Sequence, residues 1–105
     1  MIITKTPFRI SFAGGGSDLA DFYGKYGGCV LSTSINRYCY ISIHPYFDEN
    51  GTMLKYSENE LVYNLADIKH RIFNCVLNER KIQGVEITST ADIPGGTGLG
   101  SSSTF

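Results

Sequence analysis

The sequence has no long apolar run and almost no net charge, and each of these absences excludes a class of partner. A net charge of −1 provides no basic stripe of the kind that binds DNA or RNA. No stretch approaches the roughly 20 apolar residues that cross a bilayer. The first residues lack the apolar segment and the cleavage site of a secretory signal. We therefore expect a cytoplasmic protein without a nucleic-acid or membrane partner.

Cysteine is scarce as well, with three residues, Cys29, Cys39 and Cys75, far apart in the chain. An odd number without a C-x-x-C pair fits neither a disulfide framework nor a structural zinc site. The two histidines, His44 and His70, do not stand at ligand spacing to these cysteines. We expect reduced thiols in a reducing compartment.

The length of 105 residues corresponds to about one small domain. Residue patterns predict strands over 1–6, 8–13, 29–35, 37–47, 53–57 and 85–93, and helices over 17–26 and 65–80. Pro7 is expected to end the first strand, Asn64 to cap the second helix, and Asn50-Gly51 to form a hairpin turn. This order predicts an α+β fold, with a mixed or antiparallel sheet and helices against one face.

The last predicted strand leads into a glycine-rich segment, PGGTGLGSSST, at positions 94–104. Glycines before a helix let the backbone approach an anion, which the helix N–H groups then bind. The segment is not a Walker loop, because Ser101 stands where lysine is required, and Gly98 does not begin a complete G-x-G-x-x-G fingerprint. A flexible tail is the alternative, but the strand and Pro94 in front favour a phosphate-binding loop.

Two motifs resemble those of the GHMP kinases, the superfamily of galactokinase, homoserine kinase, mevalonate kinase and phosphomevalonate kinase. The segment ADIPGGTGLGSSST is similar to the family motif P-x-G-x-G-L-G-S-S, and PFRISFAGGGSDL resembles the first motif, P-G-R-[IV]-N-L-I-G-E-H-T-D in galactokinases. Both occur in the family order, roughly eighty residues apart. The GGGSD variant is most similar to the branch that phosphorylates D-glycero-D-manno-heptose 7-phosphate, with L-fucose kinase close by.

The resemblance implies that residues 1–105 are a truncated N-terminal, ATP-binding domain of the ribosomal protein S5 domain 2-like type, without the C-terminal domain. It implies transfer of the γ-phosphoryl group of ATP, with Mg²⁺, to the anomeric hydroxyl of a small sugar or sugar phosphate. The catalytic base would lie beyond Phe105, so the fragment alone is expected to be inactive. Two alternatives stay open: a non-catalytic nucleotide- or sugar-binding module, and a sibling kinase acting on L-fucose or another alcohol.

The resemblance also implies roles for single residues. Around the ATP phosphates it places Pro94, Gly95, Gly96, Thr97, Gly98, Leu99, Gly100, Ser101, Ser102 and Ser103, and Ser102 would also bind Mg²⁺.

Within the first motif, Arg9 matches an arginine near the transferred phosphoryl group. Without the motif it would be an outward polar residue on a half-buried strand. Asp18 matches an aspartate that binds sugar hydroxyls, and it would also complement the dipole of the following helix. Gly15, Gly16 and Ser17 are expected beside it in the sugar site. Gly15 and Gly16 replace Glu-His of galactokinases, and the added space would suit a bulkier acceptor.

Overall fold

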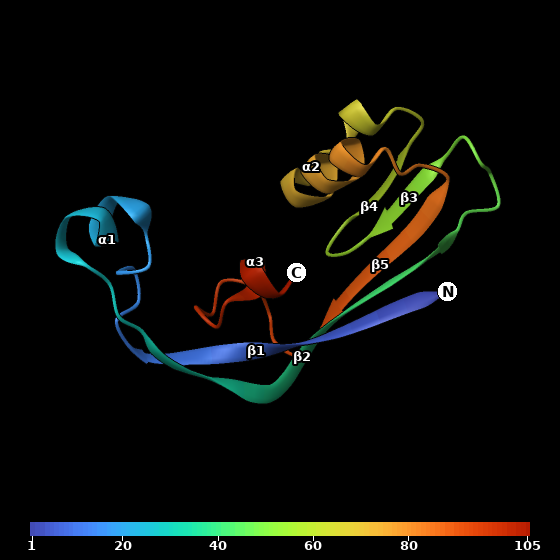
Figure 1. Ribbon diagram of the computed structural model, residues 1–105. Coiled ribbons are helices and arrows are strands. Elements are labelled where there is room, and N and C mark those ends of the chain that lie inside the picture. Colours follow the sequence, from blue (N-terminus) through green and yellow to red (C-terminus); the bar gives the residue numbers. More distant parts are fainter. The chain divides into compact units, whose positions relative to one another are not determined.

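The computed structural model describes residues 1–105, except for the side chains of Ser102 and Ser103 (Figure 1). Five strands form one sheet in the order β1-β2-β5-β3-β4, in which β3 is antiparallel to β4 and parallel to β5. The predicted mixed α+β fold is therefore confirmed. The elements are β1 (Ile2–Ala13), α1 (Ala20–Tyr26), β2 (Leu31–Pro45), β3 (Thr52–Lys55), β4 (Asn59–Val62), the 3₁₀ helix η1 (Leu65–Asp67), α2 (Arg71–Arg80), β5 (Val85–Ala91) and α3 (Ser101–Thr104).

The chain divides into two compact units, which are described separately. The first unit consists of Met1–Thr4 and Tyr40–Thr90, and the second of Lys5–Cys39 and Ala91–Phe105. None of the helices in the described part of the chain has the length and apolar character needed to cross a membrane.

β1 continues through Pro7, so the predicted end of the strand at this residue is wrong. Proline has no N–H group to give to a neighbouring strand and is therefore tolerated mainly at sheet edges. β1 is an edge strand, which explains why Pro7 does not interrupt it. The strands predicted separately over 29–35 and 37–47 likewise form one long strand, β2.

The hairpin predicted at Asn50-Gly51 is wrong as well. β2 and β3, the strands on either side, are not neighbours, because β5 lies between them in the sheet. A type I′ hairpin turn needs positive φ at both central residues, and Gly51 is not among the positive-φ glycines. Asp48 organises this turn instead. Its carboxylate accepts from the Asn50 N–H at 3.0 Å, and its carbonyl accepts from the Gly51 N–H at 3.0 Å.

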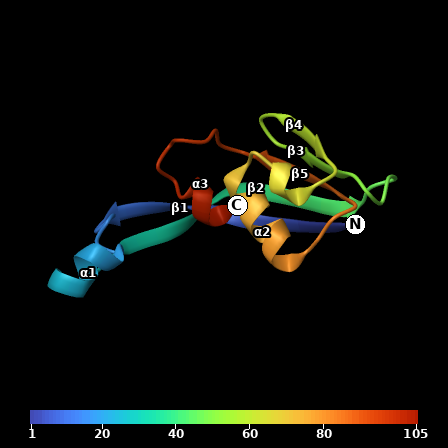
Figure 2. The same cartoon turned by 90° about the horizontal axis from the view of Figure 1, so that it is seen from above.

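The first unit holds an apolar core between its strands and α2, which lies beside β3, β4 and β5 in both views (Figures 1 and 2). Its buried side chains come from two strands, the helix and the segment before it: Leu54, Ile68, Phe73, Leu77 and Ile87. The sequence did not predict β4, because its four residues show no clear alternation of apolar and polar side chains. It pairs antiparallel with β3, with Leu54 opposite Glu60.

The helix predicted over 65–80 is two helices, η1 and α2. Asn64 caps η1 as expected, since its side-chain oxygen accepts from the Ala66 N–H at 3.1 Å. α2 has a cap of its own, because Nδ1 of His70 accepts from the Phe73 N–H at 3.4 Å. Between them Ile68 is extended, with ψ 123°, and buried. Its burial in the core therefore coincides with the break in the helix.

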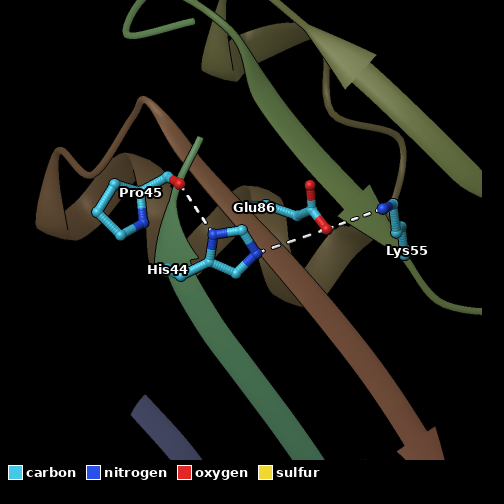
Figure 3. A network of polar contacts seen from close by, with 4 residues as sticks. All are labelled: His44, Pro45, Lys55 and Glu86. Atoms are coloured by element: carbon cyan, nitrogen blue, oxygen red, sulfur yellow. Dashed lines mark hydrogen bonds and ion pairs between the residues drawn. The ribbon is translucent and has the colours of Figure 1, made fainter. Parts of the chain in front are cut away.

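Glu86 on β5 links the neighbouring strands β2 and β3 through one carboxylate oxygen (Figure 3). Nζ of Lys55 lies 2.8 Å and Nε2 of His44 lies 3.6 Å from this oxygen. Nδ1 of His44 lies 2.8 Å from the Pro45 carbonyl, which can only accept, so Nδ1 carries a proton, and the contact of Nε2 with Glu86 is attractive only when Nε2 carries one as well. The hydrogen bond from Lys55 holds the pKa of Glu86 below its usual range. The cluster is partly solvated, so we assign it a modest share of the stability.

Glu60 on β4 is a buried carboxylate that joins the β3–β4 turn to the start of α2. Its side chain accepts from the Tyr56 hydroxyl at 2.5 Å, from the Lys69 N–H at 3.0 Å and from the His70 N–H. Burial by itself would raise the pKa of Glu60, but these hydrogen bonds outweigh it and lower the pKa. The same hydrogen bond raises the pKa of Tyr56 to about 12.

These two pKa shifts predict how stability depends on pH. Glu60 binds its proton less readily in the folded chain, so its contribution is complete above the ordinary glutamate pKa of about 4.3 and is lost as pH falls further. The contribution of Tyr56 to stability is complete below a pH of about 10, and it is lost as the pH rises towards 12. Urea unfolding of the wild type at pH 7, 4 and 3 should show the acid loss.

The matched variants are Glu60→Gln and Glu58→Gln, since Glu58 is exposed on the same turn. Glu60→Gln should reduce the free energy of unfolding at pH 7 by about 1–3 kcal/mol and flatten its dependence on pH. Glu58→Gln should keep the wild-type profile. Equal profiles for all three proteins would contradict the role given to Glu60.

Candidate functional site

Both sequence motifs lie in the second unit, and a backbone hydrogen bond joins them. The Arg9 N–H on β1 donates to the Leu99 carbonyl in the glycine loop at 3.2 Å. Figures 1 and 2 accordingly show α3 and the loop before it beside β1. The structure thus brings together two segments that lie about ninety residues apart in the sequence.

The glycine loop has a regular alternation of backbone conformation. Gly96, Gly98 and Gly100 have φ of 79°, 74° and 78°, a backbone conformation that residues other than glycine rarely adopt. Turns that alternate in this way direct successive N–H groups into a concavity that suits an anion. A Cβ at Gly95, Gly96 or Gly98 would meet nothing within 4 Å, so their backbone lies open to a ligand.

The loop ends in α3, which begins after Gly100. The Thr104 N–H and hydroxyl both donate to the Gly100 carbonyl, at 3.0 and 2.8 Å. The described loop therefore includes the predicted phosphate-site residues Pro94 to Ser101. The predictions for Ser102, as phosphate-site residue and Mg²⁺ ligand, and for Ser103 fall on side chains outside the described part.

Asp92 is a residue whose role the sequence did not reveal. Its carboxylate accepts from the Tyr38 N–H at 2.8 Å, and its own N–H donates to the Tyr38 carbonyl at 2.9 Å. Two hydrogen bonds to one residue of β2 fix the point where the chain leaves β5 and enters the loop. A single aspartate before an Ile-Pro pair carries no pattern that would have predicted this contact.

The guanidinium group of Arg9 stays on its own strand. Nη1 donates to the Ser11 hydroxyl at 2.6 Å, two residues along the strand and on the same face. Phe8, on the other face, is 2% exposed, and it and Cys39 are the two buried apolar residues in the described part of this unit. Phe12 is exposed. The other N–H groups of the Arg9 guanidinium also belong to β1, the strand whose backbone contacts the glycine loop.

The turn after β1 contains the predicted sugar-site residues. The Ser17 N–H donates to the Gly14 carbonyl at 3.1 Å, and the Gly16 N–H donates to Oδ1 of Asp18 at 3.1 Å. A Cβ at Gly15 or Gly16 would meet nothing within 4 Å, as expected for an open site. Asp18 precedes α1, whose first turn contains Asp21 instead, so Asp18 is not the dipole-complementing residue of that helix.

A pocket of about 260 Å³ opens beside this turn. It is lined by Ser17, Asp18, Tyr23, Gly28, Cys29 and Val30. Two lining residues, Ser17 and Asp18, were predicted as substrate-binding residues, whereas the other four were not singled out. Tyr23 belongs to α1, which ends at Tyr26 as predicted but buries none of its side chains. The large side chains of this helix are therefore accessible to solvent, with Tyr26 77% exposed.

The two motif regions lie at different places along β1. Gly14 is the fifth residue after Arg9, which corresponds to about 16 Å in an extended strand. Figures 1 and 2 show α1 at one end of β1 and α3 beside its middle. The structure therefore places Arg9 next to the glycine loop, whereas Asp18 lies with the pocket.

No protein-family model matches the chain. In sequence it is 30% identical, over 116 aligned positions, to D-glycero-alpha-D-manno-heptose 7-phosphate kinase of Campylobacter jejuni, an alignment that covers 99% of this chain and 34% of that protein. In structure it resembles a D-glycero-D-manno-heptose 1-phosphate kinase of Bacteroides thetaiotaomicron, with a TM-score of 0.78, 24% identity and coverage of 95% of this chain and 37% of the other.

Mevalonate kinase of Methanococcus jannaschii shares the fold too, with a TM-score of 0.69 and 23% identity over 98% of this chain and 36% of that enzyme. The chain thus spans about a third of the length of the relatives it matches. In sequence and in fold the chain is thus similar to the GHMP kinases over nearly its whole length.

Proposed function

We propose that this chain is the nucleotide-binding part of an ATP-dependent kinase that phosphorylates a sugar or sugar phosphate. The observation that carries the proposal is the hydrogen bond between Arg9 and Leu99, which holds the strand that carries Arg9 against a glycine loop whose backbone conformation suits an anion. The relative from Campylobacter jejuni is named for a heptose 7-phosphate, so we take this compound as the acceptor to test first. The catalytic base and an acidic Mg²⁺ ligand would come from parts of the protein outside these residues.

The glycine loop fits the phosphates of ATP, the group that supplies the transferable phosphoryl. The N–H groups of Gly95 to Ser101 would bind the phosphate oxygens, since the positive φ values and the open Cβ positions leave the backbone accessible. The guanidinium of Arg9 would stabilise the charge that develops on the transferred group, which is the main requirement of phosphoryl transfer. Mg²⁺, held in part by Ser102, would neutralise further phosphate charge.

The pocket beside Asp18 would take the acceptor. A carboxylate accepts hydrogen bonds from sugar hydroxyls, and Tyr23 offers an aromatic ring and a hydroxyl in the same pocket. The distance along β1 between this pocket and Arg9 favours an elongated acceptor, and a sugar with a phosphate at its far end is longer than a free hexose. Two exposed free thiols, at Cys29 and Cys75, agree with a location in the cytoplasm.

The direct test is a coupled assay of ADP release by the intact protein. With ATP and Mg²⁺ present, we expect ADP release to depend on the acceptor and to be fastest with D-glycero-D-manno-heptose 7-phosphate, compared with L-fucose and mevalonate. A faster reaction with one of the other acceptors would assign the protein to a sibling activity. No acceptor-dependent release with any of them would contradict a kinase, and ATP binding without turnover would then favour a binding module.

A matched pair of glycines tests the loop. Gly98 has φ of 74° and Gly95 has no positive φ, yet both have open space at Cβ. Gly98→Ala would force alanine into the left-handed region at a cost of about 1–2 kcal/mol, so we expect the KM for ATP to rise roughly tenfold. Gly95→Ala should raise it less. Equal KM values for the two variants would show that the backbone conformation of the loop does not matter for ATP.

Cys29 provides a test of the acceptor pocket that needs no catalysis. Cys29 lines the pocket and is exposed, whereas the exposed Cys75 lies on α2 in the other unit. Saturating heptose 7-phosphate should slow alkylation of Cys29 by N-ethylmaleimide at least several-fold, because the bound sugar would cover the thiol. Mass spectrometry would follow both sites, with Cys75 as the internal control. If heptose 7-phosphate leaves the alkylation rate of Cys29 unchanged, the acceptor does not bind in this pocket.

A further inference from the structure

Two chain segments beside the pocket approach each other more closely than side chains permit. A Cβ at Gly14 would lie 1.9 Å from the carbonyl oxygen of Cys29, and a Cβ at Gly28 would lie 2.2 Å from the carbonyl oxygen of Ser17. Neither contact can be relieved by a side-chain movement, because the opposing atom belongs to the backbone in both cases. The turn after β1 and the segment before β2 therefore pack backbone against backbone.

The hydroxyl of Ser17 lies at the centre of this contact. Its Oγ is 2.7 Å from the Gly14 carbonyl and 2.9 Å from the Cys29 carbonyl, and it accepts from the Cys29 N–H at 3.2 Å. A hydroxyl has one proton, so it donates to one of the two carbonyls at a time. We call these four residues, Gly14, Ser17, Gly28 and Cys29, the Ser17 clasp.

The contacts of the clasp make Ser17 a poor donor to a ligand. Its proton is shared between two backbone carbonyls, and a lone pair is used by the Cys29 N–H. Giving that proton to a sugar would leave a carbonyl without its hydrogen bond, which cancels most of the gain. Ser17 therefore differs from Asp18, whose carboxylate has a second oxygen beside the one that accepts from Gly16.

The clasp also forms part of the pocket wall. Three of its residues, Ser17, Gly28 and Cys29, line the pocket together with Asp18. Because Asp18 follows Ser17 directly in the chain, the position of Ser17 against Cys29 determines where the Asp18 carboxylate can lie. A small shift of a ligand-binding group is enough to reduce binding, since a hydrogen bond weakens steeply away from its preferred geometry.

We propose that Ser17 is a positioning residue for the acceptor: its hydroxyl holds the turn of the first motif against Gly28 and Cys29 and so sets Asp18 at the pocket. This inference rests on the proposed kinase function. It replaces the direct sugar contact expected of Ser17 by an indirect role.

The test measures the KM for heptose 7-phosphate and the KM for ATP in the intact protein. Ser17→Ala should raise the acceptor KM roughly tenfold and change the ATP KM less than about twofold, because the glycine loop does not depend on the clasp. Ser17→Thr keeps the hydroxyl and should restore most of the affinity for the acceptor. A structural loss affecting the whole unit would change both KM values together.

A second pair of variants separates positioning from direct contact. Gly28→Ala would push against the Ser17 carbonyl, whereas Gly24→Ala on α1 has open space and serves as its control. If Ser17 acts through the clasp, Ser17→Ala and Gly28→Ala should each raise the acceptor KM, and the double variant should be little worse than either single one. If the hydroxyl binds the acceptor directly, the two effects should multiply.

The outcomes distinguish a failure of the positioning role of Ser17 from a failure of the proposed kinase function. An active wild type in which Ser17→Ala leaves the acceptor KM unchanged, raises both KM values equally or multiplies with Gly28→Ala would overturn the role of Ser17 and leave the kinase function standing. A wild type that releases no ADP with any acceptor would overturn the kinase function, and the positioning role with it.

Discussion

The hydrogen bond from the Arg9 N–H to the Leu99 carbonyl restricts the conformation of the glycine loop, on which its proposed function depends. A loop with so many glycines has many conformations when it is unattached, and ordering it costs entropy. Here its start is fixed by the two hydrogen bonds between Asp92 and Tyr38, and its far part is fixed to β1. The N–H groups in between are therefore held in place, which would reduce the cost of binding the proposed phosphate ligand.

The glycines of the two motifs serve different physical purposes. In the loop, Gly96 and Gly98 are required by positive φ, while the space around their Cβ positions is empty. In the clasp, Gly14 and Gly28 are required because another backbone occupies the place of a side chain. The first kind leaves room for a ligand, and the second kind builds the wall of the pocket. The same residue type would thus support the proposed anion site and the proposed sugar site by opposite means.

The sequence was a good guide wherever local chemistry decides the structure. The end of the first helix at Tyr26, the Asn64 cap and the glycine loop follow from residues close together in the chain. It failed where the partner strand decides. Pro7 is tolerated because β1 lies at a sheet edge, and Asn50-Gly51 forms no hairpin because β5 separates β2 from β3. The contacts of Asp92 and Ser17 likewise depend on segments brought together only by folding.

The central claim is that the glycine loop, held against Arg9, binds the phosphates of ATP. Amide NMR of the isotopically labelled intact protein, titrated with ATP and Mg²⁺, tests it most directly. The account predicts that the largest shift changes occur at the amides of Gly95 to Ser101 and at Arg9, with little change along α2. Shift changes centred on α2 or spread evenly over the chain would contradict it.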